Sequence, residues 1–156
     1  MTNLCATFIF VAALVATAPA LVHAETETTG PTEAAAAAVR DGVFIHVSSG
    51  PEDAHRLLMA LRMADIMSMD HDVMMYFDIG GVKALTKSAP DVKHEGFESS
   101  RVMLRRLLDK GIKIQACPGC MKVAGLTADD LEKGVTTADR KDFTGFTKGR
   151  ILSLTY

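Results

Sequence analysis

The chain has 156 residues, a length that suits one domain. Its 17 Lys and Arg nearly balance its 19 Asp and Glu, and the formal net charge of −2 argues against a nucleic-acid-binding surface and against an acidic tail. Hydrophobic residues make up 48% of the sequence, enough for a packed core, although part of them lies in the first 24 residues.

The first 24 residues have the pattern of a signal peptide. They contain no Asp, Glu, Lys or Arg, the run from Phe8 to Ala16 is apolar, and Val22-His-Ala24 fits a cleavage site. We therefore expect residues 1–24 to be a signal peptide, the protein to be periplasmic, and the mature chain to begin at Glu25 with 156 − 24 = 132 residues. An uncleaved membrane anchor is the alternative, because no Lys or Arg precedes the apolar run.

Strands and helices are expected to alternate through a domain at residues 41–156, after a flexible polar spacer at 25–40. Runs of branched and aromatic residues predict strands at 42–48, 72–78, 112–116, 135–137 and 150–155. Apolar periodicity and capping residues predict helices at 51–67, 82–87, 99–110, 118–124 and 138–146, with a turn at 128–133. This alternation predicts an α/β fold with a parallel sheet covered on both faces, in which sites lie at the carboxyl ends of strands.

The sequence Cys117-Pro-Gly-Cys120 is the main chemical signal, and it directly follows a predicted strand. Cys117 is expected to cap a helix that has Pro118 in its first position, so backbone N–H groups and the helix dipole favour the thiolate of Cys117. Cys120 lies three residues later, where its thiol can resolve a bond formed at Cys117. Cys5, the third cysteine, would leave with the signal peptide.

Other roles for Cys117 and Cys120 remain open. A structural disulfide would close only a very small loop and add little stability. A zinc site of the paired-cysteine type needs a second close pair of ligands, which the sequence does not contain. A soft metal such as copper or zinc, held by these two thiols, and thiol–disulfide exchange are the alternatives. No cofactor is expected, since no G-x-G-x-x-G motif follows the first strand.

Four further residues are secondary candidates for the site. Ser49 lies in the turn before the first helix, where it either caps the helix or binds an anion. His55, in the first turn of that helix, is a candidate for tuning the thiol, and Asp78 ends the second strand, where it lines the cleft or caps. Lys122 would favour the thiolate if it faced the sulfur. His46, within a strand, is expected to be a core residue.

From about Asp41 to Tyr156 the chain resembles the DsrE/DsrF-like family of sulfur-relay proteins. The resemblance is carried by four blocks: Gly42 to Pro51, Met75 to Asp78, Ala116 to Gly125 and Phe146 to Ile151. It implies a flavodoxin-like three-layer sandwich with a mainly parallel sheet of about five strands, and homotrimers or homohexamers.

The resemblance also implies a function. In sulfur-relay members a cysteine stands eight residues before a glycine, as Cys117 stands before Gly125, and it accepts a sulfane sulfur as a persulfide. The chain is thus expected to be a sulfur carrier or sulfurtransferase-like protein that uses Cys117 with help from Cys120. Its expected partners are sulfur donor and acceptor proteins or small sulfur species, with no nucleic acid, and a membrane only if the N-terminal segment stays uncleaved.

Overall fold

The computed structural model describes residues 39–156. The predicted signal peptide lies outside these residues, as does the predicted spacer apart from residues 39 and 40. Within the described part of the chain, every helix is too short or too polar to cross a bilayer.

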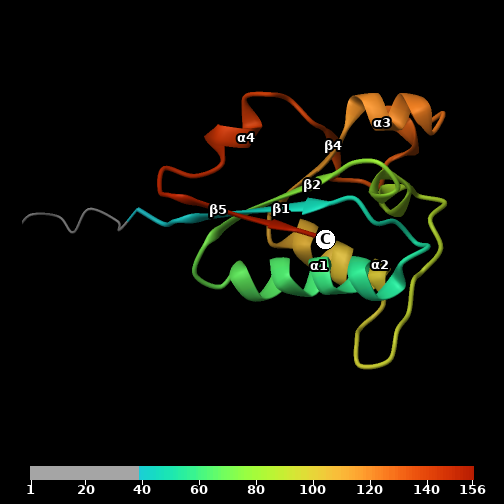
Figure 1. Ribbon diagram of the computed structural model, residues 1–156, viewed down its shortest axis with the longest axis horizontal. Coiled ribbons are helices and arrows are strands. Elements are labelled where there is room, and N and C mark those ends of the chain that lie inside the picture. The colour runs from blue at the N-terminus through green and yellow to red at the C-terminus, as the bar shows by residue number, and fades with distance from the viewer. Residues whose placement is uncertain (1–38) are drawn as a thin grey trace, which may run out of the picture. The chain divides into compact units, whose positions relative to one another are not determined.

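Five parallel strands form one sheet in the order β4-β3-β2-β1-β5 (Figure 1). The strands are β1 (Gly42–Val47), β2 (Asp72–Phe77), β3 (Lys113–Ala116), β4 (Thr136–Thr137) and β5 (Ile151–Thr155). Strands β1 to β4 are laid down side by side in chain order, and the chain then returns so that β5 pairs with the free edge of β1. The predicted α/β class and mainly parallel five-stranded sheet are confirmed.

Helices lie on both sides of the sheet (Figure 1). On one side are α1 (Ala54–Met67) and α2 (Ser100–Asp109), which pack together. Asp65 of α1 holds α2 by ion pairs of 3.1 Å to Arg106 and 2.6 Å to Lys110. On the other side are α3 (Pro118–Val123) and α4 (Asp142–Gly145), and the short 3₁₀ helices η1 (Gly81–Leu85) and η2 (Ala128–Asp130) lie in the connections.

The alternation of side chains along the central strands produces two unequal faces. The face toward α1 and α2 is fully buried: Val43, Ile45 and Val47 of β1 are each 0% exposed. The opposite face of the same strand presents Phe44 and His46, which are only half-buried. Since side chains on neighbouring strands lie in register, the polar and aromatic residues of this second face form a row across the sheet.

Two predicted helices differ from the observed ones in extent. The first begins at Ala54, because the Asp53 carboxylate caps it by accepting from the Arg56 N–H at 3.1 Å. The helix predicted at 138–146 forms only over Asp142–Gly145. That segment is held by side chains: Gln115 and Lys113 donate to the Asp142 carboxylate at 2.6 and 2.9 Å.

Candidate functional site

Cys117 lies immediately after β3, at the carboxyl end of the sheet, and caps α3. Its backbone is extended, its N–H donates to the Phe77 carbonyl at 2.8 Å, and Pro118 takes the first turn of the helix. The Cys117 Sγ accepts a hydrogen bond from the backbone N–H of Cys120 at 3.4 Å. The sequence folds this way locally because proline fits a first helical turn, where no N–H partner is needed.

Both thiols are free, but they differ in how readily they lose their protons. Burial of Cys117 works to raise its pKa, but hydrogen bonds from the Tyr76 hydroxyl, from the backbone and thiol of Cys120 and from the Gly119 N–H outweigh it, so the pKa is lowered. Cys117 is therefore the better nucleophile of the two, because the thiolate is the reactive form.

The pKa of Cys120 is shifted in the opposite direction. The Ile79 N–H donates to the Cys120 sulfur and works to lower the pKa, but the hydrogen bond to Cys117, burial, and the charges of Cys117 and Asp78 raise it overall. The backbone at Ile79 has φ = +44°, a left-handed conformation that is strained for a β-branched residue.

Three side chains lie beside the thiols on the sheet face opposite α1 and α2. His46 of β1 pairs in register with Tyr76 of β2, and their rings lie 5.9 Å apart. Asp78, two residues after Tyr76, brings its Oδ2 to 2.9 Å from His46 Nε2. Burial, together with the negative charges of Cys117 and Asp78, raises the pKa of Tyr76, so its hydroxyl keeps its proton and donates to Cys117.

An open groove of about 470 Å³ runs beside Cys120. Its walls come from the turn after β2 and from α3, and they include Lys83 of η1. Ile79 and Val123 on these walls are 69% and 91% exposed, which is unusual for large apolar side chains. The groove therefore gives a partner molecule access to Cys120 along an apolar surface.

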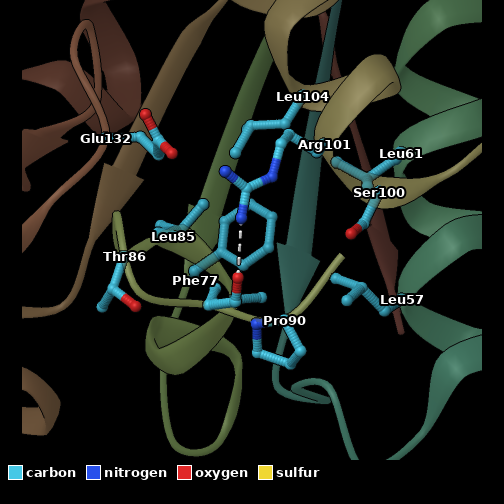
Figure 2. Close-up of a pocket in the computed structure, with 12 residues that line it drawn as sticks. Leu57, Leu61, Phe77, Leu85, Thr86, Pro90, Ser100, Arg101, Leu104 and Glu132 are labelled. Atoms are coloured by element: carbon cyan, nitrogen blue, oxygen red, sulfur yellow. Dashed lines mark hydrogen bonds between the residues drawn. The ribbon is translucent and has the colours of Figure 1, made fainter. Parts of the chain in front are cut away.

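A second pocket lies between α1, α2 and η1, and Phe77 forms its floor (Figure 2). Arg101 crosses it and donates to the Ala89 carbonyl at 2.9 Å. Its interior has room for about 20 Å³, close to that of one water molecule, so it is too small for a ligand. Neither thiol lines this pocket, and the thiol pair is the better candidate site.

The structure brings together only some of the secondary candidates named from the sequence. Asp78 lies beside the thiols, as described above. His55 instead stacks on His94, with ring centroids 4.7 Å apart, on the loop before α2. Ser49 is buried in the turn after β1, and Lys122 is exposed on α3 and is absent from the groups that act most strongly on the Cys117 pKa.

His46 and Tyr76 are site residues that the sequence analysis missed. His46 was expected in the core, but its side chain is 27% exposed and faces Asp78. A signal was present in the alternation of the strands: the register puts His46, Tyr76, Asp78 and Cys117 on the same face of the sheet, in or just after strands that end at the same edge.

Metal binding has limited support from these side chains. Across residues 39–156, no group of three or more His, Cys, Asp or Glu side chains is placed to hold a metal ion. Any metal at the thiols would thus have Cys117 and Cys120 as its protein ligands from this part of one chain.

The fold is an α/β domain with a parallel five-stranded sheet, and Cys117 directly follows the third strand. The model of the DsrE/DsrF-like family matches residues 41–150, and the chain belongs to that family. This membership suggests a role of the sulfur-relay type.

Individual relatives include an uncharacterized protein, MJ0760, from Methanocaldococcus jannaschii. It is 28% identical over 117 residues, which cover 73% of this chain but only 42% of the relative. Two solved structures share the fold. The ychN protein from E. coli has a TM-score of 0.60 and 18% identity, over 74% of this chain and 99% of that one. The protein of unknown function MTH1491 from Methanobacterium thermoautotrophicum has a TM-score of 0.52 and 18% identity, over 72% and 98%.

Proposed function

We propose that the protein is a sulfur carrier in which Cys117 takes up a sulfane sulfur and passes it to a partner. The observation that carries this proposal is the thiolate character of Cys117, which caps α3 and has its pKa lowered by the Tyr76 hydroxyl and by the N–H groups of Gly119 and Cys120, against the effect of burial. Membership of the DsrE/DsrF-like family supports it. The open groove beside Cys120 supports the approach of a sulfur donor or acceptor.

The chemistry needs two exchange steps. The Cys117 thiolate attacks the outer sulfur of a donor persulfide, R–S–SH, so that Cys117–S–SH forms and R–S⁻ leaves. An acceptor thiolate then attacks the outer sulfur and releases the Cys117 thiolate. Alternatively, the Cys120 thiolate attacks Cys117 Sγ, which forms a Cys117–Cys120 disulfide and releases HS⁻. In this second route the sulfane sulfur is reduced to sulfide, and a dithiol reductant must later restore both thiols.

Intact mass tests the proposal directly. The reduced protein is treated with polysulfide, and its mass is measured beside Cys117→Ser and Cys120→Ser variants. A gain of one sulfur that requires Cys117 and disappears on reduction supports the carrier role. If the Cys120→Ser variant, which cannot release the sulfur through a disulfide, gains no sulfur, or if the protein gains it equally without Cys117, the carrier role is wrong.

We further propose that the protein is exported to the periplasm and works as a homo-oligomer. Assembly is supported by the edge strand β5, where Ile151 and Leu152 are 46% and 53% exposed. Analytical ultracentrifugation of wild type and Leu152→Glu tests the assembly, and a monomeric wild type would contradict it. N-terminal sequencing of the exported protein tests for a mature chain that begins at Glu25.

Thiol–disulfide exchange is the second candidate function. It is favoured by the adjacency of two free thiols with opposite pKa shifts, a pattern that suits one attacking and one resolving thiol. Reduction of a test disulfide, in protein that does not take up sulfane sulfur, would favour exchange over sulfur carriage. Metal retained at a fixed ratio to the protein after purification would instead favour a soft-metal module.

A further inference from the structure

His46 and Asp78 form a close pair whose polar atoms are not fully satisfied. His46 Nε2 lies 2.9 Å from Asp78 Oδ2, and the side chains are 27% and 20% exposed. The contact lacks the alignment of a hydrogen bond, so His46 Nε2 and Asp78 Oδ1 are buried atoms without a hydrogen-bond partner in the described part of the chain. Buried polar atoms without a partner are unfavourable and uncommon in native structures, and a functional role is one explanation for them.

The pair lies on the side of the sheet that carries the thiols. His46 is directly opposite Tyr76 in the β1–β2 register, and Asp78 has the same parity as Tyr76. Cys117 is bound through its N–H to the Phe77 carbonyl, one residue before Asp78. Cys120 receives the N–H of Ile79, one residue after Asp78. The backbone contacts of the two cysteines thus fall on the residues immediately before and immediately after Asp78.

Release of sulfur through Cys120 needs a proton acceptor. Cys120 must be a thiolate when it attacks Cys117, yet its hydrogen bond to Cys117, its burial and the nearby charges, which outweigh the Ile79 N–H, raise its pKa. Cys117 cannot take the proton at that stage, because its sulfur is already bonded to the transferred group.

We propose that the His46–Asp78 pair accepts the proton of Cys120 as Cys120 attacks Cys117. The S–H bond of Cys120 breaks, its electron pair forms the Cys120–Cys117 S–S bond, and the bond from Cys117 Sγ to its outer group breaks with that group leaving as an anion. The proton passes to Asp78 Oδ1, which is buried without a hydrogen-bond partner, while His46 Nε2, 2.9 Å from Asp78 Oδ2, holds the carboxyl group in place. This inference rests on the proposed sulfur chemistry but applies to any leaving group on Cys117.

Several other groups surround the pair and set its electrostatic environment. The Tyr76 hydroxyl is committed to Cys117 and stays protonated. Lys83 of η1 lines the groove beside Cys120, and Glu52 lies against the backbone of Gly80, in the turn after Asp78. The titratable groups on the elements around the pair are therefore Tyr76, Cys117 and Cys120, with Lys83 and Glu52 farther along the turn after Asp78.

An aromatic disulfide, dithiobis-nitrobenzoate, isolates the step. Cys117 attacks the reagent and releases one nitrothiolate, which is the first phase of absorbance. Cys120 then attacks the mixed disulfide and releases the second, so the rate of the second phase reports deprotonation of Cys120. The variants are His46→Gln and Asp78→Asn. Matched controls are His71→Gln and Asp70→Asn, from an exposed His–Asp contact of 2.6 Å outside the site.

The ratio of second-phase to first-phase rate is expected to fall at least about tenfold near neutral pH in both site variants, in keeping with general-base contributions, and to stay constant in the controls. The deficit should shrink as pH rises, because solvent then deprotonates the thiol. If Asp78 acted only as a charge, Asp78→Asn would lower the pKa of Cys120 and speed the second phase. An accelerated second phase, or an unchanged one in either variant, overturns the proposal.

The wild-type protein supplies a readout that needs no variant. Attack by free thiolate alone predicts a second-phase rate that rises about tenfold per pH unit up to the pKa of Cys120, whereas proton transfer to the His46–Asp78 pair makes this rise shallower. A full tenfold slope throughout contradicts the proposal. Sulfur uptake from polysulfide, measured separately by mass, tests the carrier role, so a protein that takes up no sulfur but shows the predicted second phase contradicts only that role.

Discussion

Replacing Tyr76 with phenylalanine should weaken the thiolate of Cys117. The Tyr76 ring packs against Phe143, with centroids 5.0 Å apart, and against Phe44 at 6.2 Å, and phenylalanine preserves both contacts while removing the hydroxyl. That hydroxyl donates to the Cys117 sulfur and lowers its pKa, although burial of the thiol works against it. A hydrogen bond to a charged group contributes about 1.5–3 kcal/mol, and one pKa unit corresponds to about 1.4 kcal/mol. Because Tyr76 is only half-buried, the lower end applies, and we expect the pKa of Cys117 to rise by about one unit.

The size of the kinetic effect follows from two opposing changes. Below both pKa values, a rise of one unit reduces the thiolate fraction about tenfold, but a Brønsted slope of about 0.4–0.5 makes each thiolate about threefold more nucleophilic. Alkylation of Cys117 should therefore be about threefold slower in Tyr76→Phe at low pH. Above both pKa values it should be about threefold faster.

Iodoacetamide alkylation across pH measures this crossover, with the modified peptide identified by mass spectrometry. The Cys120→Ser background leaves one thiol at the site, and Tyr156→Phe, which changes the other tyrosine, is the control. The assignment of Tyr76 as the donor to Cys117 would be refuted if the pH profiles with and without Tyr76→Phe were identical. It would also be refuted if Tyr76→Phe slowed alkylation at every pH.

Three further predictions concern stability. Folding lowers the pKa of Cys117, so this thiol adds stability as pH rises toward the ordinary thiol pKa of 9.0. Folding raises the pKa of Cys120, so this thiol loses its contribution to stability as pH rises above 9.0. The combined contribution of the two thiols should therefore peak near that pH. Denaturant unfolding of wild type and of a double serine variant at each pH measures the difference, and a contribution that falls steadily toward pH 9 would be inconsistent. Ile79→Gly should stabilise the fold by about 1 kcal/mol, since it relieves a positive φ while removing a mostly exposed side chain; a loss of stability in the same assay would show that this backbone is unstrained. Leu107→Ala, at a fully buried position of α2, should cost about 3 kcal/mol in denaturant unfolding, and a loss below about 1 kcal/mol would mean that the core refills the space.

The sheet was predictable because its strands are short apolar runs with clear ends. Val43, Ile45 and Val47 alternate with less buried residues, and Gly42 and the polar turn after Val47 mark the limits of β1. The place of Cys117 at the carboxyl end of β3 followed from the same pattern together with Pro118. Both features depend on residues that are close together in the sequence, so a single sequence is enough to predict them.

The surroundings of the thiols were less predictable because they depend on which sheet face is covered. Alternation places His46 and Tyr76 on one face, but the sequence does not reveal that only the short helices α3 and α4 lie on that side of the sheet. The helix expected at 138–146 is longer than the observed one, which spans only Asp142–Gly145. Asp142 is held by Gln115 and Lys113, contacts between residues about 30 positions apart that no local pattern encodes.

The pairing of β1 with β5 joins the first strand of the domain to the last. Arg150, which leads into β5, binds Asp41 from 109 positions away, and Gly42 donates to the Arg150 carbonyl at 2.7 Å. During synthesis β1 therefore exposes a row of unpaired backbone groups until residues 151–155 have left the ribosome and β5 can pair with it. Such a long loop must close late, so folding should be slow, and a chain truncated before Ile151 should aggregate through β1.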